Sequence, residues 1–293
     1  MKWFLVILLL LTLPATAETT AAKLFSAKRD PAPGQAMPIG AYGRGCAQGN
    51  VELPETGPTW QAMRLSRDRN WGNPVLVQYL EDISAKAAKV GWRGLYIGDM
   101  GNPRGGPMAS GHASHQTGLD ADVWFLKPSR LDLSAAQREK ISSISIRTDD
   151  QLRVNSSYDP SYRAVLKAAA SDPRVDRIFV AAAIKIEMCK GATAADANWL
   201  QHIRPEANHQ DHFHVRLKCP PGASYCQTQK PTVADLSKGG SGCDDTLLYW
   251  VSDAYLHPKP VKPTNPPKPR KRTSREYLMA DLPQECSGVL TAN

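Results

Sequence analysis

The sequence lacks several short motifs that identify catalytic or metal-binding proteins. No C-x-x-C pair occurs, which argues against structural zinc bound by thiolates. H-E-x-x-H is absent, so the common helical zinc-protease pattern does not apply. Without an S-x-x-K, an acyl-serine mechanism has no nucleophile motif. The glycines between Gly98 and Gly118 do not follow a strand–GxGxxG–helix pattern, which argues against a nucleotide-binding loop.

Long apolar stretches are missing outside residues 1–17. The apolar run from Trp3 to Leu13 is itself too short to cross a bilayer as a permanent helix, which takes about 20 residues. Lys2 precedes this run, and Ala15-Thr16-Ala17 is a small-x-small cleavage site. We expect a secretory signal peptide over 1–17, cleaved after Ala17, and a soluble exported protein with no stable membrane anchor. The alternative is an uncleaved anchor.

Charged residues make up only 22% of the chain and hydrophobic residues 42%, which excludes a wholly disordered protein. The net charge of +8 suggests a nucleic-acid partner at first. However, residues 257–272 contain six prolines and six basic residues without an acid, and removing them with Lys2 leaves a charge of +1. We therefore expect no nucleic-acid partner. This basic proline tract is predicted to be extended, and it either contacts anionic envelope polymers or is a solvated spacer.

Six cysteines are spread over the chain. An even number in an exported protein favours three disulfides. Cys219 and Cys226 enclose a short loop, so we pair them on locality, whereas the partners of the others stay open. Residues 273–293 return to a mixed composition and contain Cys286, so we expect this C-terminal segment to be pinned back to the body.

Helix and strand patterns alternate without a regular βαβ order, which favours an α+β fold with an antiparallel sheet. Residues 18–72 are rich in Gly, Pro and polar residues and are expected to form extended loops. Asn73 and Pro74 predict the start of a helix that continues to Val90. The remaining predicted elements are strands at 95–97, 120–126, 175–180 and 213–217 and helices near 134–137, 162–170 and 181–188.

Five of the seven histidines gather in two clusters, and this distribution is the most informative feature of the sequence. On a strand, His212 and His214 face the same way, as do Asp120 and Asp122. His115 precedes Asp122 by one short loop. Imidazole and carboxylate groups suit Zn²⁺, and three such ligands with an open fourth position are typical of catalytic zinc. Either the His212–His214 pair or the His115–Asp122 pair alone would be a chance match, but the two pairs together indicate a metal site. Asp120 is expected to be a hydrogen-bond acceptor rather than a ligand.

Two long motifs carry a family resemblance. The segments GGPMASGHASHQTGLDADVWF (105–125) and NHQDHFHVRLKCP (208–220) resemble the penicillin-insensitive murein endopeptidase family, which belongs to the lysostaphin-like and D-Ala-D-Ala metallopeptidases. The resemblance runs from about residue 40 to about residue 250. It implies a zinc metallopeptidase domain over 18–256, with a small antiparallel sheet flanked by helices, zinc on one sheet face and disulfides stapling the fold.

The resemblance also assigns roles to residues. It implies that the zinc ligands are His115, Asp122 and His214, and that His209 and His212 are catalytic residues beside the metal. His212 would be a base toward water or stabilise the oxyanion, and His209 would play the complementary part. The implied disulfides are Cys46–Cys286, Cys189–Cys243 and Cys219–Cys226.

A second metal occurs in some members, held by the residue that corresponds to His112 with an Asp and a His further on. Here Asp149 and Asp150 lie in that region, but no histidine occurs between His115 and His202, so the sequence does not favour this site. Arg104 either holds a substrate carboxylate or is a solvated loop residue.

The activity that the resemblance implies is hydrolysis of the D-alanyl–meso-diaminopimelyl cross-links of peptidoglycan (murein) in the periplasm by metal-activated water. The missing S-x-x-K motif is consistent with insensitivity to β-lactams. One alternative is a D,D-carboxypeptidase or dipeptidase of the same metal class. The other is a non-catalytic zinc-containing wall-binding protein.

Overall fold

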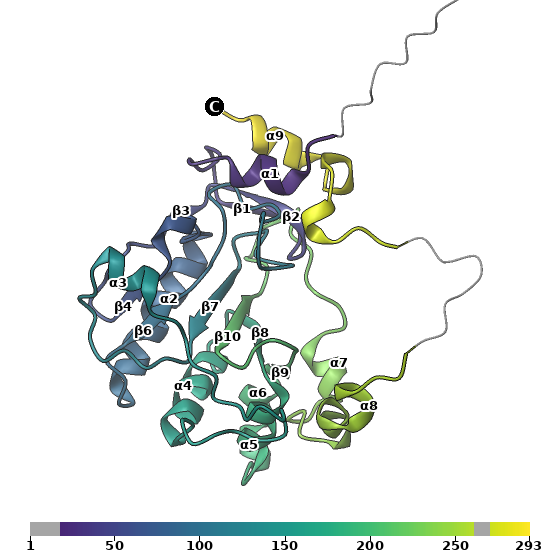
Figure 1. Cartoon of the computed structure of the whole chain (residues 1–293). Helices are drawn as coiled ribbons and strands as arrows, with labels where there is room; N and C mark the ends of the chain where they lie inside the picture. The colour runs from purple at the N-terminus through teal and green to yellow at the C-terminus, as the bar shows by residue number, and fades with distance from the viewer. Residues whose placement is uncertain (1–17, 261–269) are drawn as a thin grey trace, which may run out of the picture.

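The computed structural model describes residues 18–260 and 270–293. A six-stranded sheet lies in the middle of the fold (Figure 1). In spatial order its strands are β4 (Trp60–Ala62), β6 (Leu95–Ile97), β7 (Asp120–Trp124), β10 (His212–Leu217), β8 (Val175–Val180) and β9 (Ile203–Pro205). The predicted signal peptide and most of the basic proline tract lie outside the described residues.

The sheet is mixed, which corrects the prediction of a small antiparallel sheet. In the order β6, β7, β10 and β8, each strand is antiparallel to its neighbour, as predicted. The two outer strands differ, because β4 is parallel to β6 and β9 is parallel to β8. Each parallel pair has helices in its connection, α2 (Pro74–Lys89) in the first and α5 (Ala182–Cys189) with α6 (Ala197–Leu200) in the second. Such crossovers are what a parallel pair requires.

Helix α2 begins as its sequence predicts. The Asn73 side chain accepts a hydrogen bond from the backbone N–H of Val75 at 3.1 Å, and Pro74 occupies the first turn. The helix buries one stripe against the central core and ends before Gly91, which has φ +99°. Its buried stripe consists of Leu76, Tyr79, Leu80, Ile83, Ser84 and Ala87.

The segment 18–72 is more ordered than the extended loops predicted for it. It contains α1 (Ala21–Ser26), the hairpin of β1 (Met37–Ala41) and β2 (Arg44–Gln48), the small pair β3 (Val51–Glu52) and β5 (Trp71–Gly72), and the edge strand β4. These elements have two to six residues each, so no hydrophobic period accumulates in the sequence to reveal them.

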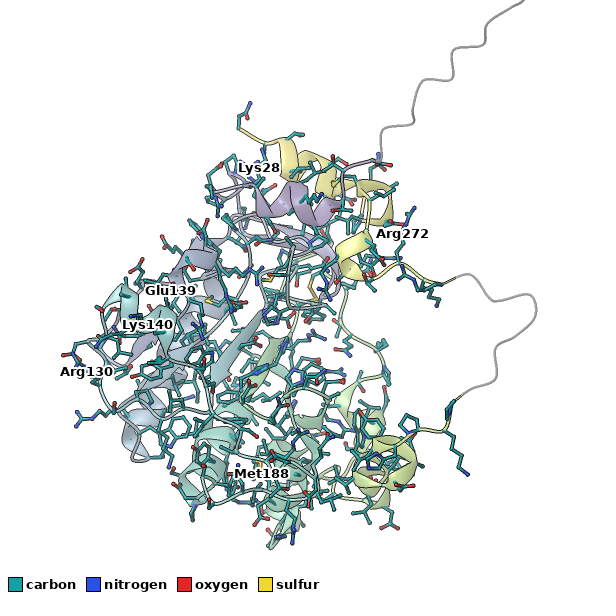
Figure 2. All side chains as sticks on the ribbon, viewed as in Figure 1. Lys28, Arg130, Glu139, Lys140, Met188 and Arg272 are labelled. Carbon is teal, nitrogen blue, oxygen red and sulfur yellow. A yellow bond between two sulfur atoms is a disulfide. The ribbon has the colours of Figure 1, made fainter. Side chains whose placement is uncertain are left out.

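The remaining helices surround the sheet and the C-terminal part of the fold. They are α3 (Ala135–Lys140), α4 (Pro160–Ala170), α7 (Val233–Ser237), α8 (Asp253–Leu256) and α9 (Glu285–Thr291). Arg130 and the α3 residues Glu139 and Lys140 lie on the outer side of the molecule (Figure 2). In the residues that the structure describes, no helix combines the length and the apolar character needed to cross a membrane.

The two ends of the described chain pack together. Helices α1 and α9 lie side by side (Figure 1), and Phe25 and Val289 belong to one buried apolar cluster. The disulfide Cys46–Cys286 joins α9 to β2. All six cysteines lie in the described ranges, and the other two disulfides are Cys189–Cys243 and Cys219–Cys226, the pairing that the family resemblance implies.

Arg104 is fully buried in this terminal cluster, so neither the substrate-binding nor the solvated interpretation of it is correct. Its guanidinium donates to the backbone carbonyls of Val289, Leu290 and Ala292 at 3.1, 3.0 and 2.6 Å, and it also pairs with Asp30. The last carbonyls of a helix have no partner within the helix, and arginine offers five N–H donors. Arg104 therefore caps the end of α9.

Candidate metal centre

The pairing of two inner strands creates the site. Strands β7 and β10 are antiparallel, with His214 opposite Asp122, Arg216 opposite Asp120, and His212 opposite Trp124. Because side chains alternate along a strand, all of these residues point to the same face of the sheet. Two segments that are far apart in sequence thus place their imidazoles and carboxylates together.

Asp122 lies at the centre of this cluster. Its Oδ1 atom is buried and has no hydrogen-bond partner within the described part of the chain. Two ring nitrogens face it, His115 Nε2 at 3.4 Å and His214 Nδ1 at 3.2 Å, and these nitrogens are 3.1 Å from each other. The three atoms form a nearly equilateral triangle. A tetrahedral zinc with ligands at about 2.0–2.1 Å separates its ligand atoms by roughly 3.3 Å, so the triangle has the size of one face of such a site.

The other nitrogens of these two rings fix their tautomers. His115 Nδ1 lies 2.6 Å from the carbonyl oxygen of Met100, which can only accept, so Nδ1 carries the proton. His214 Nε2 lies 3.1 Å from the Asp120 carboxylate and donates to it. Consequently His115 Nε2, His214 Nδ1 and Asp122 Oδ1 all present lone pairs to one another. The residues present therefore fit a bound cation.

Asp120 is the buried acceptor that organises the ligands. Besides His214, it accepts from the backbone N–H of His115 at 2.9 Å and from Arg216 Nε at 2.8 Å. Burial works to raise the pKa of the Asp120 carboxyl, but Arg216 and His214 hold that pKa far below its usual range. His115 has φ +66°, a left-handed conformation that is strained for a non-glycine residue. The bond to Asp120 holds this strained residue in place.

His112 faces the second oxygen of Asp122. Its Nδ1 is 3.4 Å from Asp122 Oδ2, and its Nε2 is 2.9 Å from Asp99 Oδ2. Asp99 is buried and also pairs with Arg67 and Arg69. His112 also lies close enough to His115 and Asp122 to form an alternative set of three candidate ligands with them, a set that does not include His214. Among residues 18–260 and 270–293, no such set joins His112 to Asp149 or Asp150.

His212 and His209 border the cluster without entering the triangle. His212 Nδ1 is 2.6 Å from Asp211 Oδ1, which leaves Nε2 free, 3.6 Å from Asp122 Oδ1. Burial works to lower the pKa of His212, but Asp122 and Asp211 raise it above its usual value. His209 donates from Nδ1 to the carbonyl of Ala207 at 2.6 Å. Burial and the imidazoles of His214 and His212 lower the pKa of His209 to about 3.

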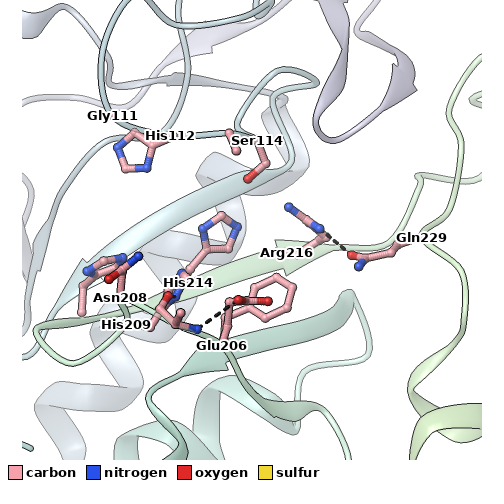
Figure 3. A pocket seen from close by; sticks show the side chains of 13 residues that line it. Gly111, His112, Ser114, Glu206, Asn208, His209, His214, Arg216 and Gln229 are labelled. Carbon is pink, nitrogen blue, oxygen red and sulfur yellow. Dashed lines mark hydrogen bonds between the residues drawn. The ribbon is translucent and has the colours of Figure 1, made fainter. Parts of the chain in front are cut away.

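Two cavities meet at this cluster. The larger, about 560 Å³, has residues 111–114 on one rim and residues 206–209 on another, with His214 and Arg216 on β10 between them (Figure 3). A smaller cavity of about 240 Å³ lies beside Asp122. His112 and His212 line both cavities, so the histidines stand between two spaces that open on either side.

Sequence reasoning named all five clustered histidines and both aspartates, and the structure brings them together. It missed Asp99, Asp211 and Arg64, which lines the smaller cavity. Asp99 directly follows the strand 95–97 and Asp211 adjoins His212, so proximity could have indicated both. No signal in the sequence marks Arg64.

A histidine and carboxylate cluster on adjacent strands, open to a cleft, is typical of metallopeptidases. Residues 38–291 match the family model described as penicillin-insensitive murein endopeptidase. The chain is 37% identical over 259 residues to the penicillin-insensitive murein endopeptidase of Haemophilus influenzae, covering 88% of this chain and 84% of the relative. The protein of that name from Klebsiella pneumoniae subsp. pneumoniae is 38% identical over 269 residues (90% and 94%), and the one from Escherichia coli K12 is 35% identical over 282 residues (96% of each). This chain belongs to the penicillin-insensitive murein endopeptidase family and is a peptidase.

Proposed function

We propose that this protein is a zinc-dependent, β-lactam-insensitive endopeptidase that hydrolyses the D-alanyl–meso-diaminopimelyl cross-links of peptidoglycan in the periplasm. The proposed zinc dependence is supported by the triangle of three lone pairs at His115, Asp122 and His214. The substrate follows from the names of the relatives, which are murein endopeptidases. The three disulfides and the predicted signal peptide support an exported protein, because disulfides persist in oxidising compartments.

The proposed ligand atoms are His115 Nε2, Asp122 Oδ1 and His214 Nδ1. A zinc ion held by these residues would lower the pKa of a coordinated water and polarise the scissile carbonyl. Met100 and Asp120 hold the two imidazoles in the tautomers that leave these nitrogens free. Asp120 also anchors the backbone of His115, so one carboxylate positions both histidines.

His212 is the proposed proton acceptor. Its Nδ1–H is engaged by Asp211, so the lone pair of Nε2 points toward the cluster, where an attacking water would lie. His209 has the same tautomer, because its Nδ1–H donates to Ala207, and its low pKa keeps it neutral. A neutral imidazole with a free Nε2 accepts a hydrogen bond but cannot donate one there. We therefore assign proton transfer to His212 and an orienting acceptor role to His209.

The cavities favour an endopeptidase over a D,D-carboxypeptidase. A carboxypeptidase needs to accommodate only a terminal residue on one side of the scissile bond, whereas this cluster has open space on both sides. The third candidate, a non-catalytic wall-binding protein, has no need for His212 beside an intact set of ligands. Insensitivity to β-lactams is supported by the absence of an S-x-x-K nucleophile motif.

One digestion tests the reaction. Purified cross-linked muropeptide dimer is incubated with the protein plus zinc and then with a chelator, and the products are identified by mass spectrometry. We expect dimers to become monomers only with zinc present. Release of terminal D-alanine without loss of dimer would indicate a carboxypeptidase, and no hydrolysis would indicate a binding protein. A fluorescent penicillin should not label the chain.

The His212→Ala variant tests the assignment of the proton acceptor. We expect turnover to fall by about 100-fold or more while zinc remains bound, because general-base catalysis typically contributes about 10²–10⁴-fold. The matched control is His257→Ala, since His257 is exposed and outside the cluster. Undiminished turnover by zinc-loaded His212→Ala would remove His212 from the mechanism.

A further inference from the structure

The smaller cavity beside Asp122 contains an arginine without an acidic partner. Arg64 lines this cavity together with Asp122 and His212. Among the residues that the structure describes, no carboxylate lies within 4.0 Å of the Arg64 guanidinium. A cation that borders the reaction centre and has no counter-ion of its own is available to a ligand.

Arg64 is nevertheless held in a defined position. Its Nη2 donates to Ser142 Oγ at 2.8 Å, and its guanidinium lies over the Trp124 ring, 5.7 Å from the ring centre. Ser142 and Trp124 also line the cavity. The backbone at Arg64 has φ +58°, in the left-handed region that non-glycine residues seldom adopt. Arg64 is half-buried and lines the cavity, so its guanidinium is held at the cavity by Ser142 and Trp124 while it remains accessible to a ligand from solvent.

The other charged groups around the cavity are already engaged. Arg67 Nη1 donates to both oxygens of Asp99 at 3.2 and 3.0 Å, and Asp99 also contacts His112. Asp122 faces the imidazoles, and Asp211 pairs with His212 at 2.6 Å. Arg64 is thus the group in this cavity best suited to recognise an anion.

We propose that Arg64 binds the free carboxylate of the substrate residue whose nitrogen forms the scissile amide. This inference rests on the proposed function, in which that residue is the D-centre of diaminopimelate and carries a carboxylate on the carbon next to the scissile nitrogen. Arg64 lines the same cavity as Asp122 and His212, so a carboxylate on the carbon next to the scissile nitrogen could reach Arg64 when the scissile bond lies at the cluster. A guanidinium pairs with a carboxylate through two parallel N–H···O bonds.

Two cross-linked substrates that differ only at this carboxylate test the proposal. One carries the free acid and the other the amide. For the wild type, we expect a preference for the acid of about 10- to 100-fold in kcat/KM, expressed mainly in KM, which corresponds to one charge-assisted contact. Arg64→Gln should lose this preference and cleave the amide as the wild type does, and Arg64→Lys should retain part of it.

Arg130→Gln is the matched control, because it removes the same charge from the outer side of the molecule (Figure 2). It should keep the full preference. If Arg64→Gln slows both substrates equally through kcat, Arg64 acts on the reacting carbonyl and the proposal is wrong. It is equally wrong if the wild type cleaves acid and amide alike.

A binding measurement separates this proposal from the proposed function. Calorimetric titration of zinc-free protein with a peptide carrying the free or amidated diaminopimelate D-centre requires no hydrolysis. We expect tighter binding of the acid by the wild type and equal binding of both by Arg64→Gln. If the wild type binds the acid more tightly and Arg64→Gln binds both peptides equally, while the wild type fails to cleave dimers, the proposed function is wrong and the carboxylate subsite is supported.

Discussion

His115 Nε2 and His214 Nδ1 lie 3.1 Å apart, and in the neutral tautomers that Met100 and Asp120 favour neither nitrogen carries a proton. Met100 and Asp120 bind the protons on the far sides of the two rings. Asp122 adds a third buried acceptor to the same space. Buried acceptors that face each other without a donor are unfavourable, so the protein alone leaves this arrangement incomplete. A cation turns the same three atoms into ligands, and the arrangement becomes favourable.

Metal binding should therefore stabilise the fold. We expect one zinc per chain and a rise in the free energy of unfolding of about 2.7 kcal/mol when free zinc is 100 times the dissociation constant. His214→Ala removes one corner of the triangle and should abolish this stabilisation, whereas His257→Ala should not. Metal analysis and thermal unfolding with and without zinc measure both effects. Equal stabilisation of His214→Ala and wild type would contradict the assigned ligands.

Asp120→Asn should weaken the site without removing a ligand. The variant loses the charge that accepts from His214 and Arg216, and loss of such an outer partner typically lowers metal affinity about 10- to 100-fold. It also leaves Arg216 buried beside a neutral group, which should cost up to about 3–5 kcal/mol of stability. Zinc titration and chemical denaturation measure the two effects. Asp245→Asn, on the exposed surface, is the control, and an unchanged zinc affinity in Asp120→Asn would contradict the positioning role.

Part of the candidate site was predictable because strands have a period of two, whereas the other histidines were named from their clustering and from the family resemblance. That period placed His212 with His214 and Asp120 with Asp122 on common faces before any pairing was known. The register that sets His214 opposite Asp122 was not predictable, because it depends on which strands become neighbours. The proposed division of roles between His209 and His212 could not be made from the sequence either, since it depends on the contacts of their Nδ1 atoms with Ala207 and Asp211.

The outer parts of the fold were harder to predict for reasons of length and burial. Strands β4 and β9 have three residues each and owe their place to parallel partners across long connections. The burial of Arg104 is not predictable, because a sequence shows the type of a side chain and not its burial. Its carbonyl partners come from the far end of the chain. The position of Arg64 in the smaller cavity is not predictable for the same reason.

The junction of the two chain ends makes a prediction about stability. Arg104→Met leaves the carbonyls at the end of α9 without their buried donor and should cost about 1–3 kcal/mol. Removing the Cys46–Cys286 disulfide should cost about 2–5 kcal/mol. Both contacts hold the same segment, so the double variant should lose less than the sum of the two. Denaturant unfolding measures each value, with Arg130→Gln as the control, and strict additivity would contradict the shared role.

Asp172 provides a pH-dependent stabilisation away from the metal site. Its carboxylate accepts from Arg174 Nε and Nη2, both at 2.8 Å, and from the Arg174 backbone N–H at 3.1 Å, and it pairs with Lys86 at 3.4 Å. The Arg174 hydrogen bonds, opposed by burial, lower the pKa of Asp172 to about 2 from its usual 3.8. A carboxyl whose pKa is lower in the folded state stabilises the fold above pH 3.8, and this contribution is lost as the pH falls through 2.

Asp172→Asn should therefore destabilise the protein near neutral pH but not in strong acid. The pKa shift corresponds to about 2.4 kcal/mol, and because Arg174 and Lys86 are partly exposed to screening solvent we expect about 1–2 kcal/mol at pH 7. The difference between variant and wild type should shrink below pH 4 and fall to a small fraction of its neutral value near pH 2, where the folded-state carboxyl is half protonated. Asp149→Asn, an exposed position, controls for loss of a charge. Denaturant unfolding across this pH range gives the result, and an undiminished difference at pH 2 would mean that Asp172 stabilises the fold through its shape and not its charge.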